Sequence, residues 1–266
     1  MPPPPCDPTA LHQAFAASRP LDWGEKQPTT AEITELHGER ATRRSLELLE
    51  RTVEVEPRVT GDFLNSIPVG TTPYHLENRI KSPESLARKL RDQRRANKRR
   101  PVDDLLRYTV LTESPDDLVA ATLDTADALA THGWRVDYAM HSYTEGSRYK
   151  GLHAWLRTPD IERVEVQWHS RASARVKELT TSWYEVERSA TATDSERTAA
   201  REKCVAASAE LHTPRGLDAM TELGGRQVQV KNYSDSRSTG SGRRVAPVEE
   251  RQRPAKLQDR AKGIAL

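Results

Sequence analysis

The chain has 266 residues and a mass of 29.9 kDa, with 35% hydrophobic and 30% charged residues. No stretch approaches the roughly 20 apolar residues that a membrane span requires, and the N-terminus lacks the regions of a secretory signal. We therefore expect a soluble, cytoplasmic protein without membrane partners, although a secreted mature form or a delivered toxin would have the same composition. The only cysteines, Cys6 and Cys204, cannot make a disulfide scaffold or a four-cysteine zinc site.

Positive charge is concentrated in two segments of a chain whose formal net charge is only +2. Residues 79–100 contain ten basic and two acidic residues, and residues 224–266 contain ten and four, which leaves −12 for the remainder. A compact basic strip within an acidic body indicates a site for phosphate-rich ligands, although charged runs are also typical of a solvated helix surface.

The composition divides the chain into three parts. Residues 1–25 form a polar, proline-rich arm with room for one short helix, and residues 26–223 carry the periodic apolar pattern of a folded domain. Residues 224–266 are polar, basic and without periodicity, so we expect this tail to be disordered.

Helices come first in the folded domain. Apolar positions from Thr29 onward favour a helix that Pro57 ends, and a shorter helix is expected over residues 59–67. Ser82 can cap a helix that continues to about residue 96, because a proline and an acidic residue follow it directly.

Strands dominate the second half of the domain. The alternating pattern predicts strands over residues 107–113, 134–141, 152–157 and 163–169. Helices are expected between the first two strands and over residues 171–188 and 196–211. This order predicts an α+β fold with a mixed, mostly antiparallel sheet flanked by helices.

Four polar side chains gather at the start of the helix that Ser82 caps. Lys81, Ser85 and Lys89 follow one another in i,i+4 steps and share a face, and Arg79 lies just ahead of them. Unpaired N–H groups at a helix N-terminus attract anions, so two ammonium groups, a hydroxyl and a guanidinium beside them favour a polyphosphate site. An ordinary solvated helix is the alternative interpretation.

Two carboxylates accompany neighbouring strands. Asp104 precedes the strand RYTVL, and strand alternation sends Glu165 and Gln167 to one face of VEVQ. Such carboxylates can hold Mg²⁺ on a nucleotide's phosphates, and one of them could accept a proton from an attacking hydroxyl. A helix cap for Asp104 and an exposed strand face for Glu165 are the alternatives.

The segment YKGLH between two strands contains a candidate base-binding loop. Tyr149 could stack on a nucleobase, Gly151 lets the backbone approach a ligand, and His153 follows four residues after the tyrosine. The sequence contains no GxxxxGK[ST], GxGxxG or CxxC motif, so P-loop, Rossmann and zinc-ribbon chemistry lack support.

Together these motifs resemble the synthetase domain of the RelA/SpoT family, whose members transfer pyrophosphate from ATP to the ribose 3′-hydroxyl of a nucleotide. The motif R-x-K-x-x-x-S-x-x-x-K matches residues 79–89, and the metal-binding aspartate before a strand matches Asp104. The motif Y-x-x-x-H matches residues 149–153, and E-x-Q matches residues 165–167. The match covers about residues 75–190, and its specificity lies in the order of the four motifs.

The resemblance implies a nucleotidyltransferase-like fold and a role for each matched residue. On the ATP side, Arg79 would pack against the adenine, while the phosphates would be bound by Lys81, Ser85 and Lys89. Asp104 and Glu165 would hold Mg²⁺, and Glu165 would act as the general base. On the acceptor side, the base would stack on Tyr149, with the nucleotide fixed by His153 and Gln167.

The resemblance leaves the acceptor open. Ser147 stands two residues before Tyr149, where guanine-selective members often carry asparagine, so the products could be of the (p)ppGpp or the (p)ppApp type. The basic tail and the toxin-like sequence DLLRYT keep the tRNA 3′ end as an alternative acceptor, and a non-catalytic nucleotide or RNA binder is the third reading. The chain reads as a small stand-alone synthetase, and a homo-oligomer is compatible with the family.

Overall fold

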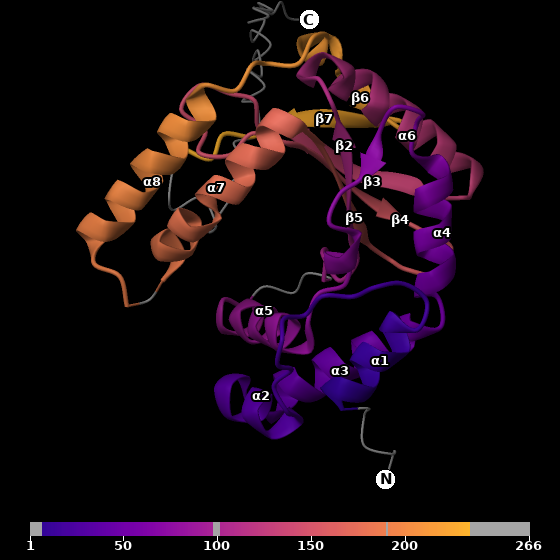
Figure 1. Ribbon diagram of the computed structural model, residues 1–266, viewed down its shortest axis with the longest axis vertical. Coiled ribbons are helices and arrows are strands. Elements are labelled where there is room, and N and C mark those ends of the chain that lie inside the picture. The colour runs from indigo at the N-terminus through magenta and orange to yellow at the C-terminus, as the bar shows by residue number, and fades with distance from the viewer. Residues whose placement is uncertain (1–6, 98–101, 190, 235–266) are drawn as a thin grey trace, which may run out of the picture. The chain divides into compact units, whose positions relative to one another are not determined.

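The computed structural model describes residues 7–97, 102–189 and 191–234. Within these ranges the strands are β1 (Thr72–Pro73), β2 (Arg107–Thr112), β3 (Arg135–His141), β4 (Leu152–Arg157), β5 (Val164–Ser170), β6 (Glu222–Leu223) and β7 (Arg226–Val230). They form a seven-stranded sheet in the order β1-β2-β5-β4-β3-β7-β6 (Figure 1). The pairs β2–β5 and β3–β7 are parallel and the other neighbouring pairs are antiparallel, which confirms the predicted mixed, mostly antiparallel sheet.

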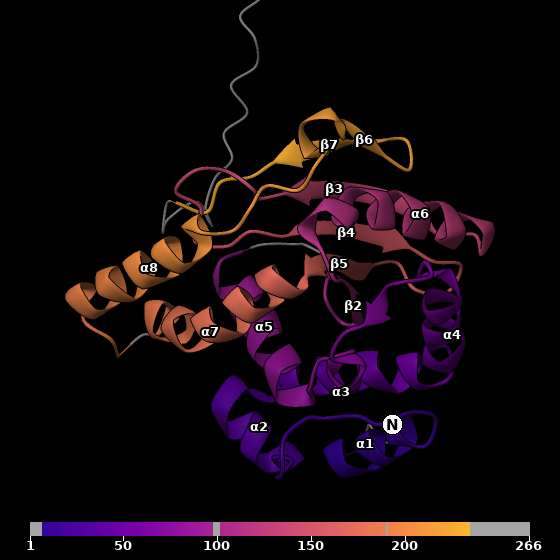
Figure 2. The same ribbon diagram turned by 45° about the horizontal axis from the view of Figure 1, so that its top comes forward.

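Helices flank this sheet on both sides. In the described part of the chain they are α1 (Pro8–Ala16), α2 (Thr30–His37), α3 (Glu39–Val53), α4 (Glu56–Ser66), α5 (Pro83–Arg95), α6 (Leu118–Thr131), α7 (Arg171–Arg188) and α8 (Asp194–Ala209). The helices α4 and α6 lie on one side of the sheet, and α7 and α8 lie on the other (Figure 1). The helices α1, α2, α3 and α5 form a group beyond β2 (Figure 2).

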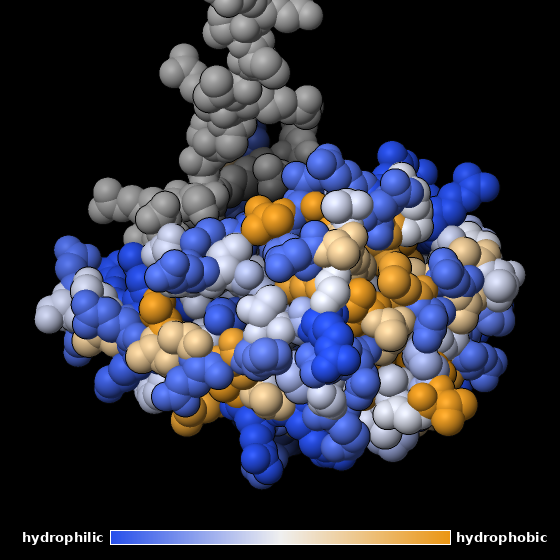
Figure 3. Space-filling model, turned by 90° about the horizontal axis from the view of Figure 1, so that it is seen from above, coloured by the Kyte–Doolittle hydropathy of each residue, from blue (hydrophilic) through white to orange (hydrophobic). Residues whose placement is uncertain are grey.

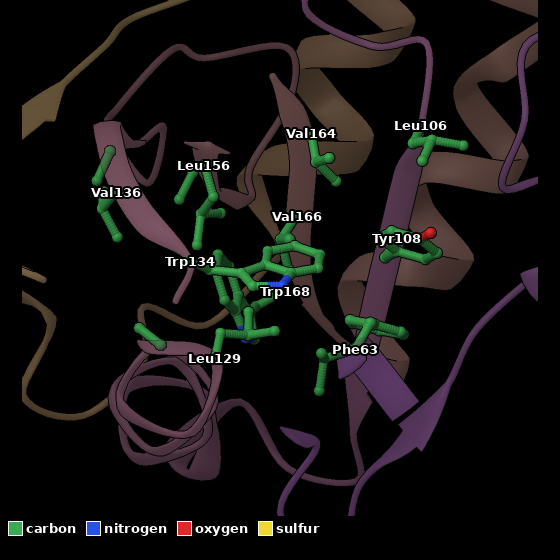
Figure 4. Close-up of a cluster of buried hydrophobic side chains, with 14 of the residues drawn as sticks. Phe63, Leu106, Tyr108, Leu129, Trp134, Val136, Leu156, Val164, Val166 and Trp168 are labelled. Carbon is green, nitrogen blue, oxygen red and sulfur yellow. The ribbon is translucent and has the colours of Figure 1, made fainter. Parts of the chain in front are cut away.

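The hydrophobic core lies between the sheet and the helices α4 and α6. Trp168 and Val166 of β5 point toward Leu129 of α6, and the ring of Tyr108 on β2 stacks on Phe63 of α4 at 4.5 Å (Figure 4). All five side chains are buried. Because residues alternate along a strand, filling this face with the core sends the intervening residues of β2 and β5 to the opposite face.

The long helix predicted from Thr29 onward is divided into α2 and α3. Gly38 has a φ of 86°, a conformation that favours glycine, and it ends α2 while it precedes α3. Pro57 does not end a helix but lies in the first turn of α4, where its missing N–H costs nothing. The predicted helix starting at Ser82 is confirmed, and the side chain of Ser82 accepts a hydrogen bond from the backbone N–H of Ser85 (3.3 Å).

The folded unit extends beyond residues 26–223 at both ends. Leu11 and Phe15 of α1 are buried, because α1 packs on α3, so residues 8–16 belong to the core and not to an arm. Strand β7 pairs with β3 and lies in the segment predicted to be disordered. The remainder of that predicted tail, residues 235–266, lies outside the described residues.

None of the described helices is both long and apolar enough to cross a membrane. On the face shown in Figure 3, hydrophobic side chains are interspersed among hydrophilic ones. The more exposed large hydrophobic residues come from separate elements, such as Leu36 of α2 and Leu179 of α7. Such scattered exposure is ordinary for a folded protein.

Candidate active site

One face of the sheet carries polar side chains where the other carries the core. Arg107 of β2 lies opposite Glu165 of β5, and Thr109 lies opposite Gln167 in the same parallel register. His153 of β4 pairs with Gln167 from the other side. These residues therefore share the face that α7 covers, and the sequence-based placement of Glu165 and Gln167 on one face is confirmed.

Glu165 stands at the centre of a buried hydrogen-bonded group. Its Oε1 accepts a hydrogen bond from Nε2 of Gln167 (2.8 Å) and contacts Nδ1 of His153 (3.0 Å). The Oε1 of Gln167 in turn accepts a hydrogen bond from Nζ of Lys177 on α7 (2.8 Å). Within the described residues no hydrogen bond reaches Oε2 of Glu165, so this oxygen is open in the sense that it has no protein partner, although the residue is only 7% exposed.

The charges around this group set two pKa values. Burial by itself would raise the pKa of Glu165, but the hydrogen bond and charge of His153, helped by Gln167 and Arg107, hold it below its usual value. Burial lowers the pKa of Lys177 to about 8, and the charge of Arg107 acts in the same direction. At neutral pH, Glu165 is therefore a carboxylate that can accept a proton.

Lys177 should make the stability of the protein depend on alkaline pH. Its pKa is about 8 in the folded state against an ordinary 10.5, so between these values the unfolded chain binds more protons than the folded one. The free energy of unfolding should therefore rise with pH across this window, and Lys177→Met should remove the rise. Urea unfolding at several pH values between about 8 and 10.5 measures this free energy, with Lys26→Met at an exposed position as the control. If the free energy of unfolding depends on pH in the same way in the wild type and in Lys177→Met, the prediction is wrong.

A chain of hydrogen bonds holds Tyr149 beside Glu165. The Tyr149 hydroxyl lies 2.5 Å from Nε2 of His153 and 2.9 Å from Nε2 of His169, whose Nδ1 lies 3.0 Å from Oγ of Ser173. Burial raises the pKa of Tyr149 well above its usual value and lowers the pKa of His169 well below its own. Both rings therefore stay neutral and fixed in orientation.

Three tyrosine rings border a pocket beside this chain. Tyr149, Tyr184 of α7 and Tyr233 after β7 line a space of about 250 Å³, together with His153 and Gln167. The structure thus brings together the three residues predicted to bind the acceptor. Sequence reasoning missed Tyr233, because it lies in the segment predicted to be disordered.

A second polar cluster lies at the start of α5. Asp104 accepts from Nζ of Lys89 (2.7 Å) and pairs with Nζ of Lys81 (3.0 Å), and Lys89 also contacts Asp103. Burial would raise the pKa of Asp104, but the two ammonium groups hold it below its usual value. Ser85, Lys81 and Asp104 line a pocket of about 410 Å³. The residues predicted to bind phosphates thus surround the predicted metal ligand.

Arg107 connects the two clusters and was missed from the sequence. It lines the pocket of Lys81, Ser85 and Asp104, while its register position faces Glu165. Its charge also contributes to the lowered pKa values of Glu165, Lys177 and His169, so it acts on the cluster around Glu165 as well. The alternation along RYTVL could have revealed it, because Arg107 and Thr109 are two residues apart and lie on the same face of β2, away from the buried Tyr108.

Arg79 does not lie in the site, contrary to the sequence-based expectation that it packs against an adenine. Its side chain is 0% exposed and its Nε lies 2.6 Å from Oε1 of the equally buried Glu56. Its guanidinium also donates to the backbone carbonyls of Pro20 (2.7 Å) and Phe15 (3.3 Å). These contacts connect Arg79 to α1, to the segment that follows α1 and to α4, and at 0% exposure the guanidinium has no surface left for a nucleotide.

The solved structures that the chain resembles include a Type VI effector and two small alarmone synthetases. The Type VI effector Tas1, solved with its immunity protein, is 18% identical over 63% of this chain and 92% of that chain, with a TM-score of 0.40. Small alarmone synthetase 2 from Bacillus subtilis is 15% identical over 63% and 89%, with a TM-score of 0.37. Small alarmone synthetase 1 from Bacillus subtilis, bound to its product pppGpp, is 17% identical over 63% and 88%, with a TM-score of 0.36.

No protein-family model matches the chain, and no curated protein matches it in sequence.

Proposed function

We propose that the protein transfers pyrophosphate from ATP to the ribose 3′-hydroxyl of a purine nucleotide, with Mg²⁺ as cofactor. The observation that supports this most is the placement of two unlike clusters on either side of Arg107. One cluster offers Lys81 and Ser85 to an anion, and the other offers a carboxylate beside a tyrosine-lined pocket. A transfer between two nucleotides needs such a pair of neighbouring subsites, one for each.

The donor subsite is suited to the phosphates of ATP. Lys81 and Lys89 both direct their ammonium groups at Asp104, and a bound polyphosphate offers them stronger anionic partners. The Ser85 hydroxyl lies in the first turn of α5, where backbone N–H groups also favour phosphate. When ATP binds, the lysines exchange Asp104 for phosphate oxygens, and the carboxylate is released.

Asp104, once the lysines have released it, and Glu165 are suitable ligands for Mg²⁺. Among the described residues no group of three or more histidines, cysteines or acids could hold a metal, but Mg²⁺ on a nucleotide usually takes only one or two protein carboxylates. Asp104 and Glu165 are deprotonated oxygen donors, and the N–H of Glu165 bonds to the carbonyl of Leu106, two residues after Asp104 (3.0 Å). Bound there, the cation would neutralise charge on the phosphates.

The acceptor subsite is suited to general base catalysis. With the acceptor base against Tyr149, the open Oε2 of Glu165 accepts the proton of the 3′-hydroxyl, while His153 and Gln167 hold Oε1. The 3′-oxygen then forms a bond to the β-phosphorus of ATP, the bond from that phosphorus to the α,β-bridging oxygen breaks, and AMP leaves. Arg107 stands where it can stabilise the negative charge between the subsites.

The structure gives Ser147 a role inside the loop and not toward the acceptor base. Its hydroxyl donates to the carbonyl of Tyr149 (2.7 Å) and accepts from the backbone N–H of Tyr233 (3.3 Å). Both bonds hold the edges of the tyrosine-lined pocket together. We therefore propose a purine acceptor without assigning the base.

The proposed transfer is tested by product analysis. The protein is incubated with ATP and Mg²⁺ and with GDP, GTP, ADP, AMP or bulk tRNA in separate reactions, and the products are resolved. We expect at least one purine nucleotide to gain a pyrophosphate while AMP is formed in equal amount. Transfer to tRNA alone would favour the alternative acceptor, and no transfer to any of the five would refute the proposal.

Gly151 should be needed for the geometry of Tyr149. A Cβ at this position would lie 2.4 Å from the Tyr149 hydroxyl and 3.0 Å from Cε1 of His169, so Gly151→Ala must displace the tyrosine. We expect kcat/KM for the acceptor to fall about 10- to 100-fold, because small displacements in a site are costly. The KM for ATP should not change. Gly61→Ala, where a Cβ meets open space, is the control, and an unchanged kcat/KM in Gly151→Ala would contradict the prediction.

A further inference from the structure

The proposed site uses only part of the basic strip at residues 79–100. Lys81 and Lys89 face Asp104, whereas Arg91, Arg94 and Arg95 come from the second half of α5. At 100° per residue, Arg91 and Arg94 lie on the side of α5 opposite to Ser85 and Lys89, and Arg95 lies on the flank next to them. Their charge therefore needs a separate explanation.

These arginines line a groove on the surface of the described residues. The groove has a volume of about 740 Å³ and lies between the second half of α5 and the first turns of α3. Five arginines and one carboxylate line the groove. They are Arg40, Arg44, Arg91, Arg94, Arg95 and Glu39. His37 also lines it, and this ring pairs with Glu84 at 2.7 Å.

Several of these guanidinium groups are left without an anion. Arg91 pairs with Asp92 and Arg44 with Glu47, but Arg40, Arg94 and Arg95 make no ion pair or hydrogen bond with any described residue. Clustering like charges without counter-charges costs free energy, which a bound polyanion would offset. The first turn of α3 adds to the positive potential of the same groove, since Gly38 provides no side-chain cap.

The groove also indicates how a ligand would be held. Arginine forks match phosphate oxygens in geometry and charge. No phenylalanine, tyrosine or tryptophan lines the groove, so it offers no aromatic surface for stacking a base. Cations from two helices, without a base pocket, suit a phosphodiester backbone better than a free nucleotide.

We propose that this groove between α3 and α5 binds the phosphate backbone of a nucleic-acid strand, independently of the base sequence. The proposal does not depend on the transfer reaction. It assigns a ligand to arginines that the ATP subsite leaves unused.

Binding of a labelled single-stranded RNA of mixed sequence to the full chain tests this, by fluorescence anisotropy over a series of salt concentrations. The triple variant Arg40→Gln, Arg94→Gln, Arg95→Gln should bind about tenfold more weakly or worse, and the slope of log K against log salt should fall by roughly 2. The control is Arg51→Gln, Arg135→Gln, Arg215→Gln, which removes the same charge from exposed positions outside the groove. Both variants keep the basic tail, so its contribution cancels.

Three further binding measurements, with DNA, with ATP and Mg²⁺ as competitor and with tripolyphosphate, test which ligand the groove takes. DNA of the same sequence should bind with the same dependence on the variant, because a backbone contact does not need the 2′-hydroxyl. Equal RNA binding by both triple variants would overturn the proposal, as would displacement of the RNA by ATP and Mg²⁺ at concentrations that fill the donor subsite. Tight binding of inorganic tripolyphosphate that needs the three arginines, with no binding of RNA, would reassign the groove to a free anion. Thermal unfolding of each variant confirms that the substitutions at these exposed positions leave the fold intact.

Discussion

Replacing Glu165 by glutamine is expected to reduce the rate of pyrophosphate transfer about 10²- to 10⁴-fold while ATP binding is retained. The amide keeps an oxygen that can accept from Gln167, so the local geometry survives. It cannot accept a proton from the 3′-hydroxyl, which is the step assigned to the open carboxylate oxygen. The kcat of transfer and the Kd for ATP, measured by calorimetry, separate the two effects.

Glu162→Gln is the matched control for this experiment. Glu162 is exposed, lies three residues earlier and precedes β5, so the same chemical change there should leave kcat unaltered. If Glu165→Gln retains the wild-type kcat, Glu165 is not the base. If it loses ATP binding together with turnover, the carboxylate acts chiefly in holding the metal and the donor.

Replacing Arg79 by methionine is expected to lower the free energy of unfolding by about 3–5 kcal/mol, the usual cost of breaking a buried ion pair. Glu56 would be left without its cation at 0% exposure, and the carbonyls of Pro20 and Phe15 would lose the hydrogen bonds that the guanidinium donates. The KM for ATP of the folded fraction should stay near that of the wild type. Urea unfolding gives the stability, and transfer kinetics at low temperature give the KM.

The double variant Arg79→Met, Glu56→Gln distinguishes a structural role from a catalytic one. Removing both charges leaves no unpaired ion, so part of the lost stability should return. Arg51→Met at an exposed position of α3 should change the stability little. Should Arg79→Met keep the wild-type stability but raise the KM for ATP, the adenine contact expected from the motif would be correct after all.

The contrast between Arg79 and Glu165 shows how far local patterns could predict this site. Strand alternation placed Glu165 and Gln167 on one face, and cap chemistry placed Ser85 in the first turn of α5, because both follow from backbone geometry within a few residues. Arg79 belongs to the same motif as Ser85. Its burial depends on Glu56, which is 23 residues away in sequence and supplies the counter-charge.

Residues that join the site from distant elements could not be predicted in this way. Lys177 reaches Gln167 because α7 packs across β5, and its low pKa is a consequence of that packing. Tyr233 borders the acceptor pocket because β7 adds to the edge of β3. A polar, glycine-containing segment looks disordered until the strands it pairs with are known, since the ladder hydrogen bonds of a strand are made with its neighbours and not within it.

The sequence by itself determined the α+β class, the order of the elements and the four motifs, because these depend on periodicity, caps and spacing along the chain. The tertiary structure decided how the basic strip is used. Helical geometry turns Lys89 toward Asp104 and Ser85 toward the pocket that Asp104 lines. It turns Arg94 to the opposite side, where Arg95 from the flank of α5 and Arg40 from α3 line the same groove. The charge surplus of residues 79–100 was visible in the sequence, but only the packing of α5 against α3 and of Arg79 against Glu56 divides it into a proposed nucleotide subsite, a buried ion pair and a second basic groove.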